Sequence, residues 1–180
     1  MKPKILYFYS IKFSVFLFLV SLRSNKVFIR KDLPIKDMKT NRYIHLWLPI
    51  IGLHALHQVE ESISFWQWYI DFVDKIPQWL QLPRIAENAH LANEHPEYFV
   101  WASIGQIALV GVIAFLCRKS EKATRIALSL YLAGLSFFLV WHILISYFTH
   151  SYSPVMVTCL IGIYLIPKWS ANVFGGFNIK

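Results

Sequence analysis

The chain has 180 residues, of which 56% are hydrophobic and only 16% are charged, and its formal net charge is +8. A soluble domain carries about 25% charged residues, so the composition argues against one and favours a membrane protein. The basic residues gather in short loops and form no basic helix interleaved with aromatic residues, which argues against nucleic-acid binding.

The N-terminal part begins with an apolar run over residues 5–22 that follows a short basic start. A cleaved signal peptide ends in a small-x-small site, and Val20-Ser21-Leu22 fits that rule poorly. We therefore expect an uncleaved anchor or an interfacial helix, and translation starting at Met38 is a third interpretation. Residues 23–42 carry seven Lys/Arg against two Asp and are expected to form a linker, so residues 1–42 precede the main domain.

Four further apolar runs approach the roughly 20 residues that a helix needs to cross a bilayer. They occupy residues 43–59, 99–117, 126–148 and 154–167. The last run is short, and to span a bilayer it needs either part of the following segment up to residue 174 or local thinning of the bilayer. The sequence therefore predicts an all-α integral membrane bundle over residues 43–174, with four core transmembrane helices plus the N-terminal apolar segment, and a tail over residues 175–180.

The connection over residues 62–98 is rich in acidic and aromatic residues. Its part from Ser64 to Leu82 is expected to lie as one amphipathic helix in the headgroup layer. Basic loops usually stay in the cytoplasm. Residues 118–125 hold four Lys/Arg against one Glu, whereas residues 60–98 hold seven Asp/Glu against two Lys/Arg. We expect a multi-pass protein of the cell membrane, with residues 60–98 outside and the C-terminus in the cytoplasm.

A polar cluster stands at the end of the second apolar run, in the sequence His57-Gln58-Val59-Glu60-Glu61. Each ionised group costs roughly 2.5–3.5 kcal/mol at a bilayer centre, so such residues usually face the interior of a bundle. His57 lies 14 residues along its span and His142 lies 16 residues along another, or about 21 and 24 Å. Two histidines on different helices are thus expected at one level, with Gln106 slightly deeper.

The helical positions predict which side chains face one another. His54, His57 and Glu61 fall within roughly a 60° arc of one helix face, and Glu60 lies about 60° off that arc. With His142 opposite, His57, Glu60 and Glu61 complete a set that can bind a divalent cation such as zinc or iron. The same set can act in acid/base catalysis without a metal. His54 and Gln106 are expected to support these residues from behind.

Other interpretations of the cluster stay open. The two glutamates can mark the end of a span in water, and His142 can be a hydrogen-bonding strut between helices. If the cluster is catalytic, a lipid-like or other apolar small molecule is the expected substrate, and membrane lipid the expected surroundings. If it is not, it forms a structural polar network, a proton-linked transport element or a partner-binding site. Cys117 and Cys159 are isolated and predict neither a thiolate metal site nor a disulfide.

The motif residues also carry a resemblance. The chain resembles the HXXEE-domain family of small multi-pass membrane proteins, whose pattern adds a later histidine and a Tyr-x-Pro-Gly element. His142 matches the histidine, and Tyr152-Ser153-Pro154-Val155 matches the last element with valine in place of glycine. The resemblance covers roughly residues 40–170 and adds Tyr152 to the supporting residues. The resemblance implies a class of protein but no particular reaction. It also implies that residues 1–37 are an N-terminal extension of the family's domain.

Overall fold

The computed structural model describes residues 41–175, and those residues form helices and turns without any strand. The all-α prediction is confirmed for this part of the chain. The expected N-terminal apolar segment, Met38 and residues 176–180 lie outside the described residues. In chain order the elements are η1 (Ile44–Leu46), α2 (Trp47–Glu60), the π turn η2 (Glu61–Phe65), α3 (Trp66–Phe72), η3 (Val73–Lys75), η4 (Gln78–Leu80), α4 (Pro83–Glu94), α5 (Pro96–Cys117), α6 (Glu121–Thr149) and α7 (Met156–Phe174).

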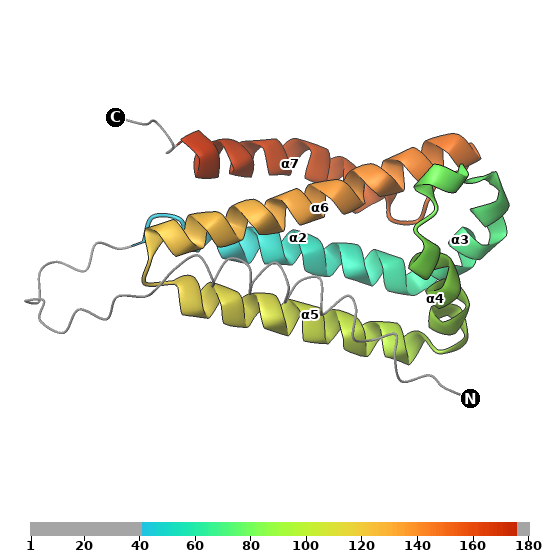
Figure 1. The fold of residues 1–180 in the computed structure, drawn as a ribbon, viewed down its shortest axis with the longest axis horizontal. Coiled ribbons are helices and arrows are strands. Elements are labelled where there is room, and N and C mark those ends of the chain that lie inside the picture. The colour runs from blue at the N-terminus through green and yellow to red at the C-terminus, as the bar shows by residue number, and fades with distance from the viewer. Residues whose placement is uncertain (1–40, 176–180) are drawn as a thin grey trace, which may run out of the picture. The chain divides into compact units, whose positions relative to one another are not determined.

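The long helices α2, α5, α6 and α7 lie lengthwise beside one another, and α3 and α4 lie together at one end of them (Figure 1). Helices α5, α6 and α7 are long and apolar enough to cross a membrane. Helix α2 has 14 residues, so the expected count of four membrane-crossing helices is supported for three. Helix α7 continues through Pro167 to Phe174 and reaches 19 residues, so it includes the segment that follows the fourth apolar run.

The connection after the π turn differs from the expected single amphipathic helix. Helix α3 and η3 end at Lys75, and Ile76 then adopts an extended conformation with φ −77° and ψ 124°. The next residue is Pro77, whose ring disfavours an α-helical conformation in the residue before it. A continuous helix over residues 64–82 is therefore excluded, and the chain instead forms η4 and α4 before α5 begins.

Two tryptophan side chains attach this connection to the α6 end of the bundle. The indole N–H of Trp68 donates to the Ser151 hydroxyl over 2.9 Å. The indole N–H of Trp141, on α6, donates to the Leu80 carbonyl over 2.8 Å. Each bond satisfies a polar group that would be costly to leave unpaired where it is removed from water. The connection is therefore fixed over the end of the bundle that carries the HXXEE residues.

Helix α6 begins and ends with defined caps, and this sets the return of α7. The Ser120 hydroxyl accepts the Ala123 N–H at its start. At its end His150 adopts the left-handed conformation, with φ 49°, in the position that commonly terminates a helix. The chain then reverses, and α7 packs back along α6 (Figure 1). The approach is close at Gly162, where a Cβ atom would lie 2.2 Å from Leu139 Cδ1.

The interior of the bundle is mostly apolar, and a minority of its buried side chains are polar. Residues such as Ile50, Leu128 and Ile145 are fully buried. The polar exceptions near the α2 end include His57, Glu61, His142, Thr158 and, one turn earlier, His54. Many large apolar side chains on α5, α6 and α7 are exposed instead. Such a surface is unusual for a soluble monomer and suits helices surrounded by lipid.

Candidate metal centre

Glu61 stands at the junction of two kinds of helix. Helix α2 ends at Glu60, and Glu61 is the first residue of the π turn. A π turn holds one residue more than the α-helical turn it replaces, and such turns are frequent at functional sites. His57 and Glu61 are 3% and 9% exposed, so the turn places a carboxyl group inside the bundle.

The Glu61 carboxyl group lies between two imidazole rings. Its Oε1 atom is 3.1 Å from His142 Nε2 and 3.8 Å from His57 Nε2. The two rings meet edge to face, with centroids 4.9 Å apart and planes at 73°. His57 comes from α2 and His142 from α6, so the structure brings the two histidines to one level, as their depths predict.

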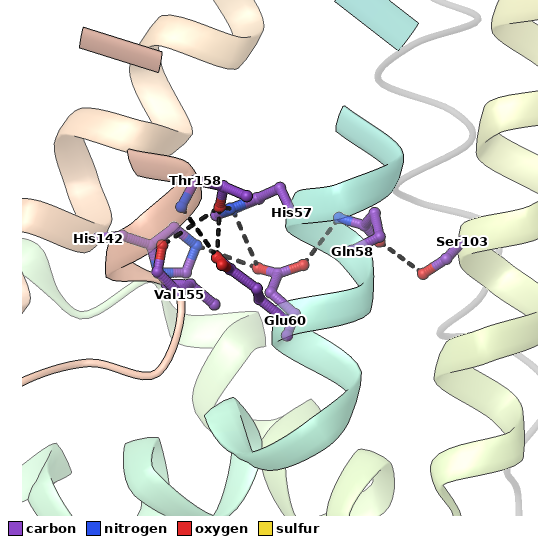
Figure 2. Close-up of polar contacts among 8 residues, drawn as sticks. His57, Gln58, Glu60, Ser103, His142, Val155 and Thr158 are labelled. Carbon is purple, nitrogen blue, oxygen red and sulfur yellow. Dashed lines mark hydrogen bonds and ion pairs between the residues drawn. The ribbon is translucent and has the colours of Figure 1, made fainter. Parts of the chain in front are cut away.

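The other carboxylate oxygen of Glu61 is held by Gln58 of α2, which is in turn bonded by Ser103 of α5. The Gln58 amide N–H donates to Glu61 Oε2 over 2.7 Å, and the Ser103 hydroxyl donates to Gln58 Oε1 over 2.5 Å (Figure 2). Gln58 precedes Glu61 by three residues, a spacing that allows such contact on a helix. Ser103 gives no comparable sequence signal, because its partner belongs to another helix.

Glu60 reaches His57 through Thr158 and makes no direct hydrogen bond to it. Its Oε2 atom accepts the Thr158 hydroxyl over 2.5 Å and the Thr158 backbone N–H over 3.2 Å. The Thr158 hydroxyl oxygen is also 2.8 Å from His57 Nδ1 (Figure 2). The structure thus groups His57, Glu61 and His142 directly, and Glu60 joins them through a threonine on α7 that no sequence motif predicts.

The central three residues fit the coordination of a divalent cation. A tetrahedral ion with ligands at about 2.1 Å holds its ligand atoms about 3.4 Å apart. The two distances from Glu61 Oε1, 3.1 and 3.8 Å, lie on either side of that value. One ligand atom from each of His57, Glu61 and His142 lies within 4.8 Å of the other two. Two imidazoles and one carboxylate therefore lie near the spacing that such an ion requires.

The same motif decides the relationship of the chain to known proteins. The model of the family described as "Protein of unknown function with HXXEE motif" matches residues 47–169, which include the HXXEE residues, His142 and Thr158. The chain belongs to this family. No curated protein and no solved structure matches this chain.

In this HXXEE protein the remaining candidate residues lie on three different segments of the chain. The His54 ring bonds the Tyr131 hydroxyl of α6, with Nδ1 2.6 Å from the oxygen. Gln106 is half-buried on α5, one turn beyond Ser103. Tyr152 is 65% exposed in the turn between α6 and α7. Of these three, His54 is the one whose buried position on α2 matches a supporting role behind His57.

Aromatic side chains enclose the histidine on α6 of the HXXEE domain. The His142 ring contacts Phe65 and Trp141 at centroid distances of 4.7 and 4.8 Å. Its Nδ1 atom and the Nε2 atom of His57 are buried without a hydrogen-bond partner among the described residues. A buried nitrogen without a partner is costly. A cation or a proton between His57 Nε2 and Glu61 would supply the missing interaction for His57.

Proposed function

We propose that this HXXEE protein is a membrane-embedded enzyme that holds a divalent cation, zinc or iron, between His57, Glu61 and His142. The observation that supports the proposal most is that three possible ligand atoms lie within 4.8 Å of one another. They come from distant parts of the chain, since Glu61 and His142 are 81 residues apart. Two histidines and one carboxylate form a ligand set used by catalytic zinc sites and by non-haem iron sites.

The surroundings of His57, Glu61 and His142 favour a bound cation over the same three side chains without one. An ionised carboxylate is costly in an apolar interior unless a charge of opposite sign offsets it. Glu61 is almost fully buried, and its neighbours His57, His142 and Gln58 are all neutral groups unless a histidine is protonated. A divalent cation supplies the missing positive charge directly at Oε1.

The proposal of catalysis follows from the number of ligands. Three protein ligands leave a coordination position open for water or substrate, which is typical of catalytic sites, whereas structural zinc sites usually have four. A cation held there polarises a carbonyl or phosphoryl oxygen, or lowers the pKa of a bound water molecule. Val59 and Ile63, which flank the glutamates, are 55% and 75% exposed. These exposed side chains place this part of the helix against lipid, and a lipid-like substrate is the class that we propose.

Metal-free acid/base catalysis by the same residues is the second candidate, and one observation favours it. If His142 binds a cation through Nε2, its ring proton moves to Nδ1, which has no hydrogen-bond partner among the described residues. Without a cation, Nε2–H donates to Glu61 Oε1 and leaves only a lone pair unpaired. In that state Glu61 and His142 form a carboxylate–imidazole pair, with His57 Nε2 as a nearby base.

Metal analysis of the purified full chain in lipid nanodiscs tests the proposal. We expect about one zinc or iron ion per chain in the wild type, and loss of that ion in His57→Ala, Glu61→Gln and His142→Ala. His90→Ala is the control, because His90 is an exposed histidine on α4 that has no part in the proposed site. Thermal unfolding of every variant separates loss of metal from loss of fold.

A lipid assay then tests catalysis on the same samples. The metal-loaded wild type is incubated with total membrane lipid, and products are identified by mass spectrometry. Turnover that disappears with the metal supports the metal enzyme, and turnover that persists after chelation supports metal-free acid/base catalysis. No stoichiometric metal, no turnover and destabilisation by every substitution in the cluster would together identify a structural network.

A further inference from the structure

Thr158 is the centre of a set of polar contacts on the side of His57 that faces α7. Its hydroxyl oxygen is 2.8 Å from His57 Nδ1 and 2.5 Å from Glu60 Oε2 (Figure 2). Its backbone N–H donates to the same oxygen of Glu60, and a longer contact of 3.3 Å joins the hydroxyl to the Val155 carbonyl. Thr158 is 3% exposed, so these contacts are made away from solvent.

We propose that Thr158 and Glu60 hold the ring proton of His57 on Nδ1 and thereby present an unprotonated Nε2 to Glu61 and His142. This inference rests on the proposed function, in which Nε2 of His57 is a metal ligand or a base. It assigns a role to Thr158, a residue outside the HXXEE motif, and separates the roles of the two glutamates. Thr158 and Glu60 are positioning residues, because they act through His57.

The direction of the bonds follows from counting donors and acceptors. A threonine hydroxyl has one proton to donate and lone pairs with which to accept. The Val155 carbonyl and an ionised Glu60 carboxylate can only accept, and Glu60 Oε2 also accepts the Thr158 backbone N–H. The hydroxyl proton therefore points to one of these two oxygens. The hydroxyl oxygen is left as an acceptor, so His57 Nδ1 must be the donor.

The consequence for the other nitrogen of His57 is direct. A neutral imidazole carries one proton, so a proton fixed on Nδ1 leaves Nε2 with a free lone pair. That atom is 3.8 Å from Glu61 Oε1 and has no hydrogen-bond partner among the described residues. Metal-binding histidines commonly donate their second N–H to an outer group, which orients the ring and raises its basicity. Thr158, supported by Glu60, is such a group.

The test compares Thr158→Val, which removes the hydroxyl at almost constant volume, with Thr158→Ser, which keeps it. Thr149→Val is the matched control, because Thr149 is a buried threonine whose hydroxyl bonds only carbonyls of its own helix. The first measurement is the ¹⁵N NMR spectrum of metal-free, histidine-labelled protein in nanodiscs, with His57→Gln used to assign the His57 signals. The second is the Zn²⁺ dissociation constant, measured by competition with a chelating dye.

In the wild type, Thr158→Ser and Thr149→Val, we expect a protonated Nδ1 and an unprotonated Nε2 at His57. Thr158→Val should shift His57 toward protonation at Nε2 and weaken Zn²⁺ binding by about 10–100-fold, the usual effect of removing an outer partner. An unchanged His57 spectrum, or unchanged Zn²⁺ affinity in a protein that binds Zn²⁺, overturns the inference. If the wild type binds no Zn²⁺ but its His57 spectrum shifts in Thr158→Val as expected, the metal proposal fails and the positioning role stands.

Discussion

Glu61 Oε1 and His142 Nε2 are 3.1 Å apart, although 81 residues separate the two positions in the chain. The His142 side chain is fully buried, and the contact joins the π turn to the C-terminal part of α6. The pair therefore links the polar cluster to the packing of the bundle, so substitutions here affect both stability and any chemistry.

The first prediction concerns this buried pair. His142→Leu alone should lower the free energy of unfolding by about 3–5 kcal/mol, because the Glu61 carboxyl group loses its partner in an apolar setting. The double variant Glu61→Leu/His142→Leu should recover most of that loss, since both polar groups are replaced by packed apolar ones. Reversible unfolding in mixed detergent micelles measures both values. A double variant that is less stable than His142→Leu contradicts the prediction.

The second prediction concerns the donors to the other oxygen of Glu61. Gln58→Leu removes the amide that binds Glu61 Oε2 and should weaken Zn²⁺ binding by about 10–100-fold. Ser103→Ala removes only the group that orients the amide and should have a smaller effect in the same direction. Zn²⁺ competition titrations measure the affinities. Gln106→Leu, one turn away on α5, is the control and should bind Zn²⁺ as the wild type does.

The third prediction concerns the contact between α6 and α7. Gly162→Ala should destabilise the protein by about 1–3 kcal/mol, because the added Cβ would lie 2.2 Å from the buried Leu139 Cδ1. Gly134→Ala on α6 is the matched control, since its Cβ would meet nothing within 4 Å, and it should be neutral or slightly stabilising. Thermal unfolding followed by tryptophan fluorescence compares them. Equal effects at both glycines would show that helix propensity, and not close packing, sets the outcome.

The fourth prediction concerns orientation. A reporter inserted near Asn88, in α4, should face the outside of the cell, and one fused after Lys180 should be cytoplasmic. The basis is the basic loop over residues 118–125 and the acidic segment over residues 60–98. Paired reporters that are active on opposite sides of the membrane read the result. The reverse pattern would place the His57–Glu61–His142 cluster near the cytoplasmic leaflet.

The sequence predicts the fold well where a feature depends on the residues of a single helix. The apolar runs locate α5, α6 and α7, and the arc of His54, His57 and Glu61 predicts three side chains that are all buried. The matched depths of His57 and His142 predict the meeting of their rings. These features depend on helical rise and rotation, which the sequence specifies locally.

The sequence does not predict features that depend on contacts between distant helices. Nothing around Thr158 or Ser103 distinguishes either from other small polar residues of an apolar helix, and their partners lie on α2. The break at Ile76 is local, and the following Pro77 could have revealed it. The π turn leaves no pattern in the residues, because one additional residue in a turn changes only the rotation of the helix after it.

That rotation has a consequence for how the protein can vary. Each helical residue turns the chain by about 100°, so the additional residue of the π turn resets the angular phase between α2 and α3. Deleting one residue from 61–65 would convert the π turn to ordinary α-helix. The Trp68 and Tyr69 side chains would then rotate away from the residues that they now contact. The π turn thus acts as a one-residue spacer between α2, which carries His57, and α3. Because of it, the side chains of α2 can face the cluster while those of α3 face the other partners that they contact.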